Sequence, residues 1–211
     1  ITKNNADIAE CGYFITTSDY SIVSKCSLKD EEILGNYECS YNYLIKNNTT
    51  NFCVNKLYKK SIFKNIRFPN LKFSEDYAVN AKASYKCEKK ITISDCCYYY
   101  VINPDSACNQ SFNETKLDII KSGKEVFRYF EYRFPQLCKF IVLYILNNIR
   151  KLYKELVESN TLDKKKYKKY LIDEYKKYYL LIERNLYKTV KFKKTYIALW
   201  LFNRSPTLYY L

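Results

Sequence analysis

The chain has 211 residues, 47% of them apolar, which is enough for one domain with a sizeable appendage and rules out a disordered protein. Only three glycines and four prolines occur, so a turn-rich all-β architecture is excluded and long helices are favoured. The formal net charge is +14, and most of it lies in the segment 150–194, which has 15 basic and 6 acidic residues.

Side chains that usually form a metal centre are sparse. Nine cysteines occur without a Cys-x-x-Cys pair and the chain has no histidine, so a zinc site is not expected. An odd number of cysteines in a chain of this length is typical of reduced thiols in a cytosolic protein. No apolar run is longer than seven residues, far fewer than the roughly 20 that span a bilayer, so no transmembrane helix is expected.

The first predicted elements are a strand and a helix. Residues 6–15, ADIAECGYFI, predict a strand in which Gly12 permits a close backbone approach. A helix is predicted from Ser27, as its N-cap, to about Leu44, because acidic residues in the first turn suit the positive end of the helix dipole. Gly35 is expected to break this helix.

The next stretch predicts a strand, a short helical turn and a helix. Residues 52–58 alternate in polarity, which indicates a strand with one packed face and one face on a cleft. Residues 59–65 predict the helical turn. Ser74 can then cap a helix whose first turn carries Glu75 and Asp76. Asp76 would lie at the edge of the buried stripe, where it can face a cleft.

The remainder of the chain changes from strands to helices. Two strands, 91–93 and 97–102, are expected before an Asn-Pro-Asp turn. The apolar period then predicts four helices, at 114–130, from Pro135 onward, at 163–187 and at 194–211. The second and third of these are expected to form an antiparallel hairpin. The apolar side of the last one must rest on the preceding helices, on a second subunit or on lipid.

One pattern goes beyond secondary structure. Asn-Lys-Leu-Tyr at 55–58 is followed by Ile-Arg-Phe-Pro at 66–69, Glu-Asp at 75–76 and Tyr-Tyr-Tyr at 98–100. In this order and spacing the segments resemble the acceptor-side half of family 2 glycosyltransferases with a GT-A fold, over about 6–113. The resemblance implies a mixed, helix-rich α/β chain. Residues 1–112 would form an incomplete GT-A-like sheet portion, and residues 113–211 an all-helical basic region.

The resemblance also implies an inverting sugar transfer with Asp76 as the catalytic base. Asp76 would take the proton from an acceptor hydroxyl while the nucleoside diphosphate leaves from the opposite side of the sugar. Glu75 would orient the acceptor or the helix terminus. Without the resemblance, two acids in a first turn only stabilise the helix dipole, by about 0.3–1 kcal/mol.

Five further residues are candidates for substrate binding, each with a structural alternative. By resemblance, Asn55 and Lys56 border the pocket and can contact sugar hydroxyls or diphosphate oxygens, although a lysine in a strand is more often simply exposed. Arg67 has a comparable role, or pairs with the acidic residues. Tyr99 points away from its two tyrosine neighbours and suits either sugar stacking or core packing. Ser106 matches a serine of the family, or is only a turn residue.

The metal motif of the family is missing. Glycosyltransferases of this fold normally bind Mg²⁺ or Mn²⁺ through an Asp-x-Asp motif, and this chain contains none. We therefore expect no cofactor in this chain and Mg²⁺ or Mn²⁺ in the complete enzyme. The amino-terminal nucleotide-binding half is not recognisable either, so the chain is expected to be inactive alone.

The resemblance implies a nucleotide-sugar donor and a glycan or lipid-linked acceptor, in bacterial surface polysaccharide synthesis at the cytoplasmic face of the membrane. The basic segment 150–211 suits peripheral contact with anionic lipid, and the helical region can also form a homo-oligomer. No specific nucleic acid is expected. The alternative is a non-enzymatic module whose basic helices bind anionic lipid, nucleic acid or a protein partner, while the acidic pair only caps a helix.

Overall fold

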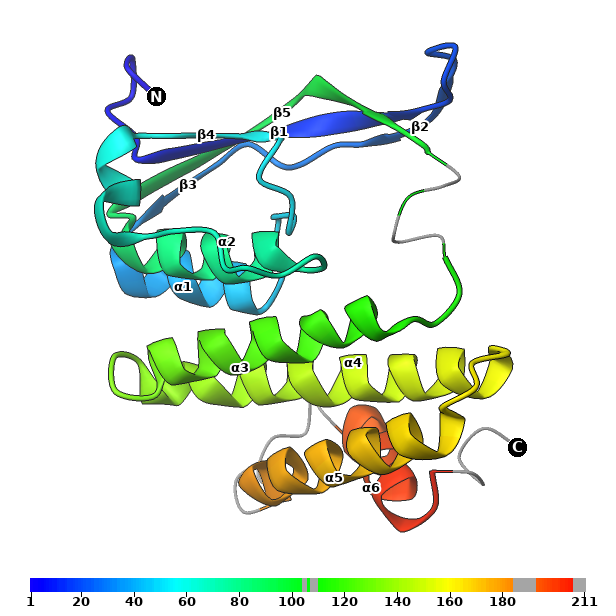
Figure 1. Cartoon of the computed structure of the whole chain (residues 1–211). Helices are drawn as coiled ribbons and strands as arrows, with labels where there is room; N and C mark the ends of the chain where they lie inside the picture. Colours follow the sequence, from blue (N-terminus) through cyan, green and yellow to red (C-terminus); the bar gives the residue numbers. More distant parts are fainter. Residues whose placement is uncertain (104–105, 107–109, 184–192, 207–211) are drawn as a thin grey trace. The chain divides into compact units, whose positions relative to one another are not determined.

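The computed structural model describes all residues except 104–105, 107–109, 184–192 and 207–211 (Figure 1). The chain forms two compact units, Ile1–Asn109 and Gln110–Leu211. The first contains a sheet with helices, and the second is helical in its described part. This confirms the mixed, helix-rich α/β class.

The sheet of the first unit is built around β1 (Ile8–Thr16). The strand order is β2-β1-β5-β3. Outside this order, β4 pairs with residues 8–10 of β1. β1 and β5 run parallel, whereas the other pairs are antiparallel. The remaining strands are β2 (Ile22–Cys26), β3 (Glu31–Leu34), β4 (Lys56–Tyr58) and β5 (Lys89–Val101).

One face of this sheet is covered by α1 (Asn36–Leu44) and α2 (Glu75–Lys86) (Figure 1). The predicted helical turn is present as the 3₁₀ helix η1 (Lys60–Asn65). Apolar side chains of the sheet, the helices and η1 form the core between them, namely Ile8, Ile33, Cys39, Ile62, Ile66, Val79, Ala83 and Cys87. The α2 residues in this core, Val79 and Ala83, lie on the side of the helix opposite the predicted apolar stripe. The stripe residues Tyr77, Ala78, Ala81 and Ser84 are buried as well, so α2 is buried on more than the one predicted face.

The prediction of a helix starting at Ser27 is wrong for the residues before Asn36. Residues 31–34 form β3, which pairs antiparallel with β5, and the helix begins only at Asn36. Asp30, expected in a helix turn, accepts a hydrogen bond from Ser94 N at 2.6 Å. Gly35 has φ = 90°, a left-handed conformation that separates strand from helix at little cost for glycine. Pairing with β5 therefore outweighed the local acidic pattern.

Two strand predictions also change in extent. The strand predicted over 52–58 is formed only at Lys56–Tyr58, because residues 52–55 are held in a loop by polar contacts. The two strands predicted at 91–93 and 97–102 are one strand, β5, with an irregular register opposite Gly12. A Cβ on Gly12 would lie 2.7 Å from the backbone oxygen of Cys26, which confirms the expected close approach.

The second unit follows the predicted helices closely. α3 (Asp118–Phe130) follows the short η2 (Glu114–Leu117), and α4 (Cys138–Glu158) follows η3 (Pro135–Leu137). α5 (Lys164–Glu183) packs against α4, as expected for a hairpin, and α6 (Lys193–Arg204) packs against α5. Residues 184–187 and 207–211 of the predicted helices lie outside the described residues. Within the described part of the chain, no helix is long and apolar enough to cross a membrane.

Candidate functional site

The first turn of α2 holds the carboxylate of Asp76 against a loop. Ser74 is the N-cap residue, as predicted, but it has a left-handed backbone (φ = 63°) and its side chain makes no capping hydrogen bond. Asp76 is half-buried, and its Oδ2 accepts a hydrogen bond from Cys53 N at 3.2 Å. The pKa of the Cys53 thiol is raised to about 12 by burial and by the charge of Asp76. The Asp76 carboxylate is therefore fixed at the helix start, facing residues 51–53.

The next turn of α2 holds the same loop. Asn80 Nδ2 donates to Asn51 O at 2.7 Å, and Tyr58 OH donates to Asn80 Oδ1 at 2.5 Å. From α1, Tyr43 OH donates to Asn51 Oδ1 at 3.1 Å. Residues 51–53 are thus positioned by side chains from both helices and from β4.

An aromatic cluster includes Phe52, which precedes Cys53 in this loop. The ring of Phe52 stacks on Tyr100 with centroids 5.2 Å apart and meets Tyr13 edge-on at 5.6 Å. Tyr13 and Tyr100 contact each other at 6.3 Å, and all three rings are half-buried. Burial and the neighbouring Cys26 and Tyr100 raise the pKa of Tyr13 to about 12, so this phenol is neutral. Such partly exposed faces with hydroxyl groups suit contact with a sugar ring.

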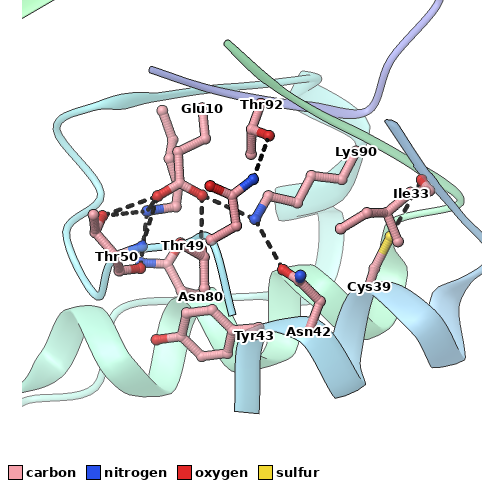
Figure 2. A network of polar contacts seen from close by, with 12 residues as sticks. Glu10, Ile33, Cys39, Asn42, Tyr43, Thr49, Thr50, Asn80, Lys90 and Thr92 are labelled. Carbon is pink, nitrogen blue, oxygen red and sulfur yellow. Dashed lines mark hydrogen bonds and ion pairs between the residues drawn. The ribbon is translucent and has the colours of Figure 1, made fainter. Parts of the chain in front are cut away.

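A buried charge cluster lies beside the loop, between the sheet and the helices (Figure 2). Glu10 of β1 is fully buried, and its two carboxylate oxygens lie 2.9 Å from Nζ of Lys56 and 2.9 Å from Nζ of Lys90. Lys90 also donates to Asn42 Oδ1 at 3.4 Å. Both lysine side chains are at most 5% exposed, so each charge depends on this carboxylate rather than on water.

The same carboxylate ties down the beginning of the loop. Thr49 Oγ1 donates to Glu10 Oε2 at 2.7 Å, and Thr50 N donates to Glu10 Oε1 at 2.7 Å (Figure 2). Burial alone would raise the pKa of Glu10, but the charges of Lys90 and Lys56 and these hydrogen bonds lower it to about 2. Glu10 is therefore ionised at neutral pH, and its carboxylate binds the first residues of the loop, Thr49 and Thr50.

Asn55 and Lys56, both predicted to contact substrate, belong to this buried network. Asn55 Nδ2 donates to Cys11 O at 2.7 Å. Lys56 Nζ donates to Phe52 O at 2.5 Å and to Thr50 O at 3.0 Å. The structure thus brings these two residues together with the Asp76 loop, but it buries their polar atoms within the protein.

The hydrogen bonds and ring contacts of the remaining predicted residues, as far as the structure describes them, do not involve the Asp76 carboxylate. Arg67 is exposed and donates to the backbone oxygens of residues 63 and 66, and in the described part of the chain it forms no ion pair with Glu75 or Asp76. Tyr99 is exposed and stacks on Phe14 at 5.3 Å, whereas its neighbour Tyr100 joins the aromatic cluster. Ser106 is half-buried, and its backbone N–H donates to Asn103 O at 3.1 Å. Glu75 is half-buried in the first turn of α2.

Sequence reasoning missed Glu10, Tyr100 and Phe52, as well as Tyr13, Lys90 and Asn80. Glu10 had a detectable signal, because an acid in the middle of an apolar strand must find a buried partner. Tyr100 is separated from Tyr99 by the alternation of strand faces alone, and the sequence did not reveal which face meets the loop. Phe52 was read as part of a strand, although it lies in the loop.

Two further features limit the chemistry that this region can supply. Among the described residues, no three His, Cys, Asp or Glu side chains form a group that could hold a metal ion. These residues therefore do not fit the divalent ion that the family resemblance implies. A pocket of about 290 Å³ is lined largely by apolar residues such as Val54, Leu57 and Ile93, and Asp76 is not among its lining residues.

Comparison with known proteins adds no relative from which function could be transferred. No protein-family model matches the chain, and no curated protein matches its sequence.

Proposed function

We propose that residues 1–112 are the acceptor-side portion of a GT-A glycosyltransferase, which transfers a sugar from a nucleotide donor to a glycan or lipid-linked acceptor. The observation that carries this proposal is the position of Asp76. Its half-buried carboxylate is held at the start of α2 by Cys53 N, and the residue before Cys53, Phe52, belongs to the cluster with Tyr13 and Tyr100. A fixed carboxylate and an aromatic cluster that share one loop suit an acceptor sugar whose hydroxyl must be deprotonated.

In the proposed reaction Asp76 acts as general base. The acceptor hydroxyl gives its proton to the carboxylate while its oxygen forms a bond to the anomeric carbon. The bond from that carbon to the diphosphate oxygen breaks on the opposite face, so the configuration inverts. A carboxylate has about four acceptor positions, and one backbone N–H leaves capacity for the substrate hydroxyl.

The other residues have positioning roles in this proposal. Tyr100 and Phe52 would stack on the acceptor. Lys56 and Asn55 act on the loop rather than on the substrate, because their polar groups are committed to Glu10, Thr50 and Cys11. Glu75 orients the helix terminus.

The donor half of the reaction needs groups that this chain does not supply. Neither an Asp-x-Asp motif in the sequence nor a metal-ligand cluster among the described residues is present. No step is therefore assigned to a metal ion here. The proposal requires a nucleotide-binding portion that completes the domain, and this chain alone is expected to be inactive.

The test uses the parent polypeptide, extended upstream until it includes an Asp-x-Asp segment. Nucleotide release from a panel of nucleotide sugars is measured with Mn²⁺ for wild type and for Asp76→Asn. We expect a loss of about 100-fold in the variant, the scale of general-base catalysis. Asp173→Asn makes the same chemical change at an exposed position of α5 and should leave the rate unchanged. Equal release by wild type and Asp76→Asn would remove Asp76 from the mechanism.

A second candidate, a non-enzymatic basic binding module, is favoured by one feature of α5. Over residues 164–182, where side-chain exposure is described, its solvent-facing side carries five exposed lysines and one exposed acid, namely Lys165, Lys166, Lys169, Lys176, Lys177 and Asp173. Such a surface attracts anionic partners. Absence of nucleotide release from a folded parent chain with every donor would favour this candidate.

A further inference from the structure

The middle of the last described helix, α6, is a run of seven apolar residues, 196–202, with polar residues at both helix ends. One face is packed inside the second unit, where Leu199 and Phe202 are fully buried. The ring of Phe202 lies 4.6 Å from Tyr175 and 5.3 Å from Tyr153, and Tyr175 OH donates to Leu199 O at 2.7 Å. This face fixes α6 to α4 and α5 and leaves the opposite face outward.

The outward face of α6 carries Ile197, Trp200 and Leu201, here called the α6 patch. These residues are 55%, 41% and 44% exposed, and their spacing of three and four residues puts them on one side of the helix. Large apolar side chains that are grouped on one exposed helix face are typical of a surface that binds a partner. The α6 patch is such a group.

Basic side chains occur beside the patch on α6 and on α5, the helix against which α6 packs. Arg204, one turn beyond Trp200, has its guanidinium 5.5 Å from the centre of the indole ring. The solvent-facing side of α5 carries the five lysines named above and ends in the exposed Leu180 and Leu181. Leucine and tryptophan next to lysine and arginine are the composition of helices that lie in the headgroup region of membranes.

We propose that the α6 patch inserts into the interface of an anionic lipid bilayer, with the α5 lysines and Arg204 contacting the headgroups. The helix would lie on the membrane, in keeping with the finding that no described helix is long and apolar enough to cross one. This binding requires no donor or acceptor sugar, so it can be tested separately from the proposed glycosyl transfer.

Charge argues for a membrane over the other occupants of the patch. A second copy of this chain, with its net charge of +14, would bring like charges together around the patch. Nucleic acid would satisfy the lysines, but phosphates offer nothing to the aliphatic side chains of Ile197 and Leu201. An anionic bilayer complements both the charge and the apolar surface.

The chain has one tryptophan, and it is Trp200, so fluorescence reports directly on the patch. The full chain is titrated with vesicles of phosphatidylcholine containing about 30% phosphatidylglycerol, an anionic lipid surface. We expect a blue shift of Trp200 emission and quenching by lipids brominated on the upper acyl chain. Pure phosphatidylcholine vesicles should bind about tenfold more weakly or worse, and high salt should weaken binding to the anionic vesicles.

Two double variants distinguish vesicle binding by the α6 patch from binding by other exposed apolar residues. Ile197→Ser with Leu201→Ser keeps the tryptophan and should weaken vesicle binding about tenfold or more. Val157→Ser with Leu162→Ser removes two exposed apolar residues outside α6 and should leave binding unchanged. Circular dichroism checks that both variants remain helical.

Three results would overturn the proposal. The first is an unchanged Trp200 emission with anionic vesicles. The second is emission that is already blue-shifted in buffer and insensitive to lipid, which would mean that the chain covers its own patch. The third is a concentration-dependent dimer in light scattering that the α6 double variant abolishes, since a second copy would then be the occupant.

Discussion

The two units are stabilised by different interactions. The first unit buries a charge cluster between sheet and helices, in which the single carboxylate of Glu10 pairs with both Lys56 and Lys90. The second unit buries mainly aliphatic and aromatic side chains, and its ion pairs, such as Lys116 with Glu155, are only partly buried. The first unit should therefore be sensitive to loss of a single charge, and the second to loss of side-chain volume.

The largest effect is expected from Glu10→Gln. The substitution keeps the shape but leaves two buried lysines without a counterion, which should destabilise the first unit by about 3–5 kcal/mol. Hydrogen–deuterium exchange with mass spectrometry measures each unit separately, and the loss of protection should be confined to residues 1–103. Glu32→Gln breaks the exposed pair with Lys89 and should cost less than about 1 kcal/mol. Equal effects of the two substitutions would contradict the role given to the cluster.

For the second unit, Leu146→Ala should cost about 3–4 kcal/mol. Leu146 is fully buried in α4, so the truncation loses apolar burial and leaves a cavity. Val157→Ala on the same helix removes methyl groups from an exposed position and should change stability by less than about 0.5 kcal/mol. Urea unfolding followed by Trp200 fluorescence reports on this unit. A small effect of Leu146→Ala would mean that the packing around α4 can collapse into the space.

Acid should weaken the first unit through Glu10. Its pKa is about 2 in the folded chain and 4.5 in the reference state, so its stabilisation is present above about pH 4.5 and is lost as the pH falls towards 2. The difference corresponds to about 3 kcal/mol. Hydrogen exchange of residues 1–103 between pH 5 and pH 3, corrected for intrinsic rates, measures this loss. The Glu10→Gln variant should show a shallower dependence on pH, and an identical slope would assign the effect to other carboxylates.

The smallest difference is expected between two glycine substitutions. A Cβ at Gly12 would lie 2.7 Å from the backbone oxygen of Cys26. A backbone atom cannot move aside as a side chain can, so Gly12→Ala should lower the free energy of unfolding by about 1–3 kcal/mol. A Cβ at Gly123 would lie 2.6 Å from Cγ1 of Ile145. At Gly123, which lies inside α3, the higher helix propensity of alanine offsets about 1 kcal/mol of the cost of this contact with Ile145. Thermal unfolding of both variants gives the comparison, and a larger cost at Gly123 would reverse it.

The sequence by itself determined most of the second unit. Apolar residues recurring every three to four positions, with Pro135 at a helix start, were enough to place α3, α4 and α5, because a helix satisfies its backbone within the segment. It also marked Gly12 as a close approach and Glu75 and Asp76 as the first turn of α2. The assignment of those acids to sugar transfer rests on motif order and spacing.

Only the tertiary structure decided the arrangement around Asp76. Residues 31–34 became a strand because β5 offers them backbone partners. Residues 52–55 became a loop because Glu10 of β1 and two side chains of α2, Asp76 and Asn80, bind the adjoining residues 50, 51 and 53. Because these contacts fix the position of the loop, the ring of Phe52 stacks on Tyr100 and not on Tyr99. All of these depend on partners 20 or more residues away in the chain, whose strand register and orientation a local pattern does not contain.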